Sequence, residues 1–196
     1  FSLIVTGSLS DINLTSTNPS IIQCSTEDAE FKFDYTQQIQ TTTTVSVDNL
    51  PVGATASFSQ SSISDDGEIT LTVGALENVA AGTYDINIIA TNGDETQNKK
   101  VELRVVHPEF TDNPMSLSSP VNESAGVLFP EIELEWNENI NAESYTVELS
   151  DNPSFTNIIA TSTQSDLKFT ATGLTENSIY YWRVNPTNQC GLATSP

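Results

Sequence analysis

Short stretches in which apolar and polar residues alternate recur along nearly the whole chain. Alternation with a period of two is typical of half-buried β-strands, and almost no stretch has the 3.6-residue period of an amphipathic helix. Gly, Pro, Asn and Asp separate these stretches, and such turn residues between short strands are typical of β-sandwiches. The pattern therefore predicts an all-β protein.

The first part of the chain contains six predicted strands. Asn-Gly at positions 92 and 93 separates the last two, and this pair is a strong hairpin signal. Residues 1–7, FSLIVTG, form a further short apolar segment, either the first strand of this part or the last strand of a preceding module. The six strands are predicted at residues 31–35, 44–50, 54–59, 68–73, 83–91 and 100–106.

The alternation stops between His107 and Pro114, where two prolines and several polar residues predict a linker. We therefore divide the chain into a sandwich at residues 1–107, a linker at residues 108–113 and a second sandwich at residues 114–196. The predicted fold class is two tandem antiparallel β-sandwiches. The strands of the second sandwich are predicted at residues 115–120, 132–136, 144–150, 157–163, 167–172 and 179–184.

An aromatic cluster, IYYWRV, occupies the last of these strands. Strand alternation places Tyr180 and Trp182 on one face, and Tyr181 and Arg183 on the other. Tyr181 and Arg183 are therefore candidate exposed contacts, and we expect a cross-strand ion pair between Arg183 and Glu148. Large aromatic residues on alternating strands usually fill cores. The predicted core aromatics are Trp136, Tyr145 and Trp182.

The charge of the chain is strongly negative, because 26 acidic residues oppose 6 Lys and Arg, and the formal net charge is −20. Such a surface repels phosphate backbones and anionic lipids, so we predict no nucleic-acid partner and no membrane insertion. No apolar run reaches the ~18 residues needed to span a bilayer. We expect any signal peptide to lie outside the chain, and we interpret the chain as a piece of a larger secreted or cell-surface protein.

The two cysteines, Cys24 and Cys190, lie in opposite halves of the chain. An inter-domain disulfide is one alternative, and two unpaired thiols are the interpretation that we favour. Two cysteines without a cluster of histidines do not have the spacing of a zinc site.

Motifs for catalysis are absent from the sequence. The single histidine, His107, lies at the break in the pattern, where a capping or solvated role is commoner than general-base chemistry. Glu133 and Glu135 lie on the outward face of a strand, without the cleft that a glycosidase pair needs. We therefore predict no catalytic residue and no residue that binds an organic cofactor.

A calcium ion is the one cofactor that the sequence allows. Asp65, Asp66 and Glu68 in the stretch SDDGE are Ca²⁺ candidates, because hard oxygen ligands close in sequence can hold this ion. Asp151 and Asn152 open a similar turn. The spacing of an EF-hand is missing, and Asp, Asn and Gly are also the residues that turns require. We favour turn chemistry over a metal.

The second half of the chain resembles a fibronectin type III domain. The family pattern has a Trp on its second strand, here Trp136 in LEW, and a Tyr-x-Val third strand, here SYTVEL with Tyr145. It also has a Leu six residues before a Tyr, here Leu174 and Tyr180. The resemblance implies that all these residues are structural, and that the Tyr180 hydroxyl binds the backbone upstream as a tyrosine corner. The family's last strand should follow Cys190, so we expect that strand to be truncated.

The first half resembles the immunoglobulin-like modules of bacterial secreted proteins. The resemblance rests on LPVGATASFS at residues 50–59, AAGTYDINIIAT at residues 80–91 and the closing VELRV. Both resemblances imply accessory repeats, downstream of a catalytic domain, in large secreted bacterial proteins that are often peptidases.

These observations favour a non-catalytic function. We expect spacer modules that orient or present a neighbouring catalytic domain, whose partners are the neighbouring domains of the parent chain. The alternative is a pair of adhesion modules that bind a carbohydrate or a cell-surface protein. A binding module needs exposed aromatic residues gathered on one surface, and Tyr181 is the one residue of the cluster that we expect to find exposed.

Overall fold

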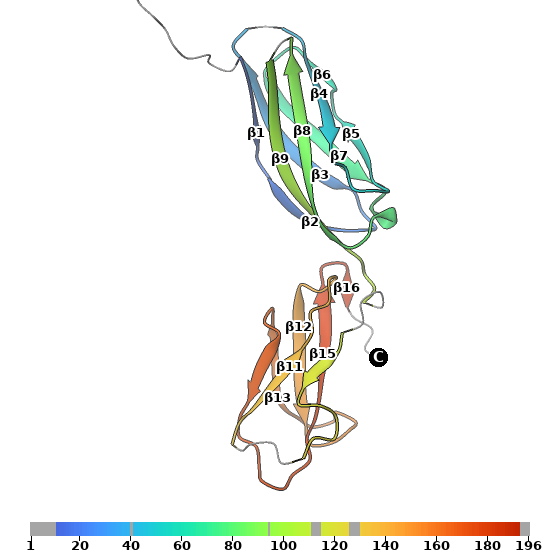
Figure 1. The fold of residues 1–196 in the computed structure, drawn as a ribbon, viewed down its shortest axis with the longest axis vertical. Coiled ribbons are helices and arrows are strands. Elements are labelled where there is room, and N and C mark those ends of the chain that lie inside the picture. The colour runs from blue at the N-terminus through green and yellow to red at the C-terminus, as the bar shows by residue number, and fades with distance from the viewer. Residues whose placement is uncertain (1–10, 40, 94, 111–114, 126–129, 193–196) are drawn as a thin grey trace, which may run out of the picture. The chain divides into compact units, whose positions relative to one another are not determined.

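The computed structural model describes residues 11–39, 41–93, 95–110, 115–125 and 130–192. The chain divides into two compact units, residues 1–105 and residues 106–196 (Figure 1). Within the described ranges the only helical element is one turn of 3-10 helix, η1 (Leu76–Asn78), and no helix could cross a bilayer. The strand predicted at residues 1–7 lies outside the described residues.

The first unit is a sandwich of two sheets, with strand orders β1-β3-β7-β5 and β2-β9-β8-β4-β6. The strand pairs whose register is defined are antiparallel. These orders match the A-B-E-D and G-F-C sheets of the immunoglobulin fold, so the first unit is immunoglobulin-like, as predicted. Its strands are β1 (Ile12–Ser16), β2 (Ser20–Cys24), β3 (Ala29–Gln37), β4 (Thr43–Asp48), β5 (Thr55–Phe58), β6 (Ser62–Ile63), β7 (Gly67–Gly74), β8 (Gly82–Asn92) and β9 (Glu95–Val106).

The core of the first unit is built by alternation along the central strands. Phe31, Phe33 and Tyr35 on β3 are at most 1% exposed. In the register with β7, Phe31 lies opposite Leu71 and Phe33 opposite Ile69, and these two residues are fully buried as well. Full burial of a large apolar side chain contributes about 1.5–3 kcal/mol. The inner faces of β3 and β7 are therefore a main source of this unit's stability.

The hairpin between β8 and β9 forms where the Asn-Gly signal predicted it. Asn92 pairs with Glu95, so Asn92 is the last strand residue and Gly93 is the first residue of the loop. Gly93 has φ of 58°, in the left-handed region that a two-residue hairpin loop requires at this position. Tyr84 on β8 is only partly buried, and its hydroxyl donates to the carbonyl oxygen of Ala80 at 2.8 Å. The first unit thus has a tyrosine corner of its own, which the sequence analysis did not predict.

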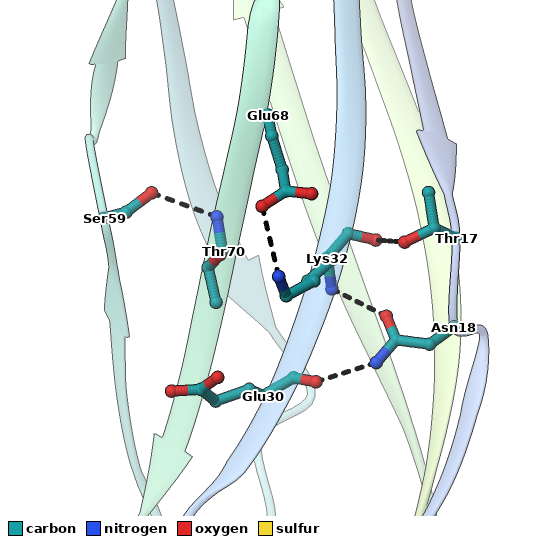
Figure 2. A network of polar contacts seen from close by, with 7 residues as sticks. All are labelled: Thr17, Asn18, Glu30, Lys32, Ser59, Glu68 and Thr70. Atoms are coloured by element: carbon teal, nitrogen blue, oxygen red, sulfur yellow. Dashed lines mark hydrogen bonds and ion pairs between the residues drawn. The ribbon is translucent and has the colours of Figure 1, made fainter.

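Strands β1 and β2 belong to different sheets although they are close in sequence. The alternation pattern did not predict either strand. Figure 2 shows how the side chain of Asn18 makes this change of sheet possible. Its Nδ2 donates to the carbonyl oxygen of Glu30 at 2.8 Å, and its Oδ1 accepts the backbone N–H of Lys32 at 2.7 Å. Both partners lie on β3 beyond the end of its pairing with β1. The side-chain amide of Asn18 therefore satisfies backbone groups of β3 that have no paired residue of β1.

Further polar contacts extend this network across the same sheet (Figure 2). The backbone N–H of Thr17 donates to the carbonyl oxygen of Lys32 at 3.0 Å. The Lys32 Nζ lies 3.3 Å from Glu68 Oε1 on β7. Beyond β5, the backbone N–H of Thr70 donates to Ser59 Oγ at 3.0 Å, and the Ser59 N–H donates back to the Thr70 carbonyl at 2.8 Å. Side chains thus continue the ladder where strands end.

The second unit is also a sandwich, with sheets in the orders β10-β11-β14 and β13-β12-β15-β16. All its strand pairs with a defined register are antiparallel, and the three-stranded and four-stranded sheets give a fibronectin type III-like fold, as predicted. The expected truncation of the last strand falls on residues 191–196, of which 191 and 192 form β16 and 193–196 lie outside the described residues. The strands are β10 (Leu117–Ser119), β11 (Ile132–Trp136), β12 (Ser144–Ser150), β13 (Ile158–Gln164), β14 (Lys168–Ala171), β15 (Tyr181–Asn188) and β16 (Gly191–Leu192).

Replacing Asn18 with Ala should destabilise the first unit. The variant loses two hydrogen bonds to β3, each worth about 0.5–1.5 kcal/mol, so we expect its free energy of unfolding to fall by about 1–2 kcal/mol. Hydrogen exchange of the most protected amides of β3 and β7 measures this quantity. Tryptophan fluorescence reports the second unit, which holds both tryptophans, and should not change.

The matched control is Asn13→Ala, because Asn13 is an exposed residue of β1 and makes no side-chain contact of this kind. We expect its effect to stay within about 0.5 kcal/mol. An equal decrease in the free energy of unfolding in the two variants would contradict the role assigned to Asn18.

Candidate functional site

The residues considered for catalysis are engaged in structural contacts. The backbone N–H of His107 donates to Asn141 Oδ1 at 3.0 Å. Glu133 Oε2 lies 3.1 Å from the Lys168 Nζ, and this hydrogen bond lowers the pKa of Glu133 and raises the pKa of Lys168. Across the described ranges, no group of three or more His, Cys, Asp or Glu side chains could hold a metal ion. Glu133 is thus held as a carboxylate by its ion pair.

The three calcium candidates have separate partners. Asp66 Oδ1 accepts the backbone N–H of Gln37 at 2.9 Å, and Asp65 Oδ2 accepts the hydroxyl of the preceding serine at 3.1 Å. Glu68 forms the ion pair with Lys32 that Figure 2 shows. These contacts are what a turn between β6 and β7 uses to bind its own backbone and its neighbours.

The turn that begins at Asp151 is organised in the same way. Asn152 Oδ1 accepts the backbone N–H groups of Ser154 and Thr156, each at 3.2 Å. Asp151 accepts side-chain amide hydrogen bonds from Asn152 at 2.9 Å and from Asn157 at 2.7 Å, which lower the pKa of Asp151. The two side chains hold the loop between β12 and β13 in a defined conformation.

The predicted core aromatics are not equally buried. Trp136 and Tyr145 are each 3% exposed, with ring centroids 5.9 Å apart and an interplanar angle of 57°. Trp182 packs against the same core but is only partly buried. The position of Trp182 explains its greater exposure, because β15 begins at Tyr181 and Trp182 therefore lies close to the start of its strand.

Leu174 and Tyr180 lie in the chain that leads into β15. Leu174 is 7% exposed and belongs to the core. The backbone N–H of Thr175 donates to the Tyr180 hydroxyl at 2.9 Å, and this hydrogen bond lowers the pKa of Tyr180. The contact has the geometry of a tyrosine corner. It fixes the approach of the chain to the central strand of its sheet.

The outer face of the four-stranded sheet carries the two candidate exposed contacts. Tyr181 is 36% exposed. Arg183 lies opposite Glu148 in the register, and its Nε donates to Glu148 Oε2 at 2.6 Å, so the expected cross-strand ion pair is present. The Arg183 guanidinium also lies 4.3 Å from the ring centroid of Phe155. The sequence pattern does not indicate Phe155, whose φ of 51° places it in the left-handed region within the Asp151 turn.

Asparagine side chains bind the segment that the sequence predicted to be mainly linker. Asn141 accepts the backbone N–H of His107 at 3.0 Å and donates to the carbonyl oxygen of Glu109 at 2.8 Å. Asn188 Nδ2 donates to the His107 carbonyl oxygen at 2.8 Å. With a third asparagine these residues form what we call the asparagine cradle: Asn139, Asn141 and Asn188.

Asn139 completes the cradle from a fully buried position. Its Nδ2 donates to the carbonyl oxygen of Phe110 at 3.2 Å, and its Oδ1 accepts the backbone N–H of Asn141 at 2.9 Å. Its own N–H donates to the Tyr145 hydroxyl at 2.9 Å. Residues 107–110 are therefore fastened to the second unit. The alternating asparagines of NENIN before β12 were the available sequence signal.

Both cysteines, Cys24 and Cys190, are disulfide-bonded, and neither is a free thiol. This corrects the expectation of two unpaired thiols. A disulfide requires Cα atoms about 4.4–6.8 Å apart, and the distance between cysteines along a sequence carries no information on that separation.

An open groove of about 680 Å³ lies at one end of β11. Its lining exposes more apolar than polar surface, and its cation, Lys168, is already paired with Glu133. The buried Trp136 Nε1 has no hydrogen-bond partner among the residues that the structure describes. The groove is lined by Ser118, Glu135, Trp136, Asn137, Ser165, Asp166, Leu167 and Lys168.

No family model and no curated protein matches the chain. A solved titin fragment, domains A168-A170, is 17% identical over 92% of this chain and 62% of that chain, with a TM-score of 0.43. A segment of two fibronectin type III domains from chicken tenascin is 12% identical over 89% of each chain, with a TM-score of 0.31. The VesB protease of Vibrio cholerae is 10% identical over 48% of this chain and 31% of that chain, with a TM-score of 0.33.

This chain therefore spans less than two thirds of the titin fragment's length. Its class follows from its own strand orders: it is an all-β protein, with an immunoglobulin-like sandwich followed by a fibronectin type III-like sandwich.

Replacing Arg183 with Lys should destabilise the second unit although the charge is kept. Lys has neither the Nε donor that binds Glu148 nor the planar group that stacks on Phe155. We expect a loss of about 0.5–1 kcal/mol, which is modest because the Arg183 side chain is 42% exposed. Urea unfolding followed by tryptophan fluorescence measures it. In a Phe155→Leu background the same substitution should cost less, and an equal cost would show that the ring contact contributes nothing.

Alkylation should detect no free thiol in the oxidised chain. Treatment with iodoacetamide in denaturant without reductant should leave the mass unchanged, since both cysteines are disulfide-bonded. After reduction, the same treatment should add 2 carbamidomethyl groups, one for each cysteine. Any alkylation before reduction would contradict the disulfide-bonded state.

Proposed function

We propose that the chain is a pair of non-catalytic accessory modules of a larger secreted or cell-surface protein, which space and orient a neighbouring catalytic domain. The observation that carries this proposal is the asparagine cradle. A spacer can set orientation only if its connecting segments have a defined conformation, and flexible linkers do not. Here the backbone of residues 107–110 is bound by buried or half-buried side chains of the second unit.

The asparagine cradle holds residues 107–110 with polar side chains that must be buried. Asn139 and Asn141 are fully buried, and a buried amide is costly unless its hydrogen bonds are made. Both side chains make hydrogen bonds to backbone groups of this segment, and the Asn139 side chain also accepts the backbone N–H of Asn141. This use of buried polar groups supports a segment whose conformation matters.

Two further observations support the secreted or cell-surface location. Disulfide bonds persist in oxidising compartments, and both cysteines are disulfide-bonded. The formal net charge of −20 favours high solubility and disfavours adsorption to nucleic acids and anionic membranes. A peptidase-like bacterial parent is part of the proposal, and its support is the resemblance of both halves to accessory modules.

The rival function is an adhesion module that binds a carbohydrate or a cell-surface protein. Sugar sites of this kind present several exposed aromatic rings on one surface. Among the aromatic residues of the described ranges, Tyr181 is the most exposed, at only 36%, and the Arg183 guanidinium lies over the ring of Phe155. This distribution favours the spacer.

Hydrogen exchange tests the role of the cradle. We expect the His107 amide to be protected in the wild type, and Asn141→Ala to raise its exchange rate about tenfold or more, because the variant loses the acceptor of that amide. Asn185→Ala on β15 is the matched control and should leave residues 107–110 unchanged. An unprotected His107 amide in the wild type would remove the observation on which the spacer rests. Saturable binding of the purified chain to a glycan array would favour the adhesion module instead.

A further inference from the structure

One strand edge of the second unit is open and lacks most of the usual protection. β13 lies at the end of its sheet, and in the described part of the chain it pairs with β12 alone. Its sequence, IIATSTQ, has no charged residue, no Pro and no Gly. Natural edge strands are commonly blunted by charge, by Pro or by short length, because their free N–H and C=O groups recruit other strands.

The other edge strands that the structure describes in the two units are shorter. β1 and β2 have 5 residues each, β5 and β14 have 4 each, and β14 also carries Lys168. β13 has 7 residues. Its one protective feature is an irregularity at its start, where the register shifts between Leu149 and Ser150. From Ala160 to Gln164 the pairing with β12 is uninterrupted, so this stretch presents a regular open ladder.

We propose that β13 is the docking edge for an extended cationic polypeptide segment, which adds a strand to the sheet. A row of free backbone groups is matched by another backbone in extended conformation, with pockets or charges alongside giving the selectivity. Ile158 and Ile159, at 36% and 40% exposed, offer apolar contacts at the start of the strand.

The charge of the occupant follows from the carboxylates at the two ends of β13. Asp151 is held beside the start of the strand by Asn157, whose Nδ2 lies 2.7 Å from Asp151 Oδ2. Asp166 follows shortly after the last strand residue, and the nearby Lys168 is paired with Glu133. The fitting segment therefore has apolar or β-branched residues in its centre and a basic residue near each end, about 23 Å apart for 7 strand residues. A second copy of this chain fits poorly, since both copies carry a charge of −20.

A synthetic peptide tests the proposal on the intact chain. The probe is a capped peptide of alternating Thr and Val with a Lys at each end. We expect its addition to slow the exchange of alternate amides between Ala160 and Gln164, and binding to weaken as salt is raised. The same peptide with Glu at both ends should bind about tenfold more weakly. The Lys peptide with its amides N-methylated along one edge should not bind, because it cannot extend the ladder.

Binding that is unchanged by N-methylation, or protection that appears on another edge strand, would overturn the proposal. The absence of binding by the Lys peptide would do the same. Dimerisation of the chain through β13, seen by sedimentation without peptide, would replace the cationic occupant with a second copy. None of these outcomes depends on the asparagine cradle, so the proposed spacer function stands or falls separately.

Two proline variants of the protein test whether the open edge of β13 binds the peptide. Neighbouring N–H groups of a strand point to opposite sides, so of Thr161 and Ser162 one donates toward β12 and the other points to the open edge. We expect one of Thr161→Pro and Ser162→Pro to stay folded by tryptophan fluorescence, and this variant should not bind the Lys peptide. Thr170→Pro on β14 alters a different edge and checks that a general loss of stability is not the cause. A folded proline variant on β13 that binds as the wild type does would contradict the proposal.

Discussion

The architecture depends on how backbone hydrogen-bonding groups are satisfied where a strand ends or the chain leaves its sheet. A sandwich buries its inner faces by simple alternation, but each change of direction exposes N–H and C=O groups that need partners. In both units asparagine provides them, because its amide carries a donor and an acceptor in nearly the geometry of a peptide group. Asn18 does this for β3, and Asn139 and Asn141 do it for the segment before β10.

The few basic residues of the chain act mainly through ion pairs between neighbouring strands of the sheets. Among the described residues four ion pairs are seen, and in each case the partner lies on the neighbouring strand. Exposed pairs of this type contribute only about 0.2–1 kcal/mol each, so they are not the source of stability. They do place a positive charge between strands of a strongly acidic protein, where unpaired carboxylates on adjacent strands would repel one another. The four pairs are Lys32–Glu68, Lys100–Asp85, Lys168–Glu133 and Arg183–Glu148.

A spacer and a docking edge place opposite demands on a β-sandwich. The spacer needs a connection of fixed conformation, which the asparagine cradle provides through side chains that are largely removed from water. A docking edge needs backbone groups that remain available, and β13 presents such groups because it lies at the end of its sheet. The two features lie in the same unit but use different side chains, because the cradle is formed by asparagines before β12 and at the end of β15, whereas the docking edge is β13. One unit can therefore serve both.

The sequence by itself determined the fold class, most of the strands and many of the inward-facing residues on the longer strands. Period-two alternation reports directly which side chains face inward, and this local signal is strong on long strands such as β3, β8 and β12. It failed for β1, β2 and β6, which are short and supported mainly by their neighbours. Only the tertiary structure decided the disulfide-bonded state of Cys24 and Cys190, the ring of Phe155 over Arg183 and the buried amides of the cradle. The ring contact and the cradle contacts join residues far apart along the chain, and no local pattern encodes a distance in space.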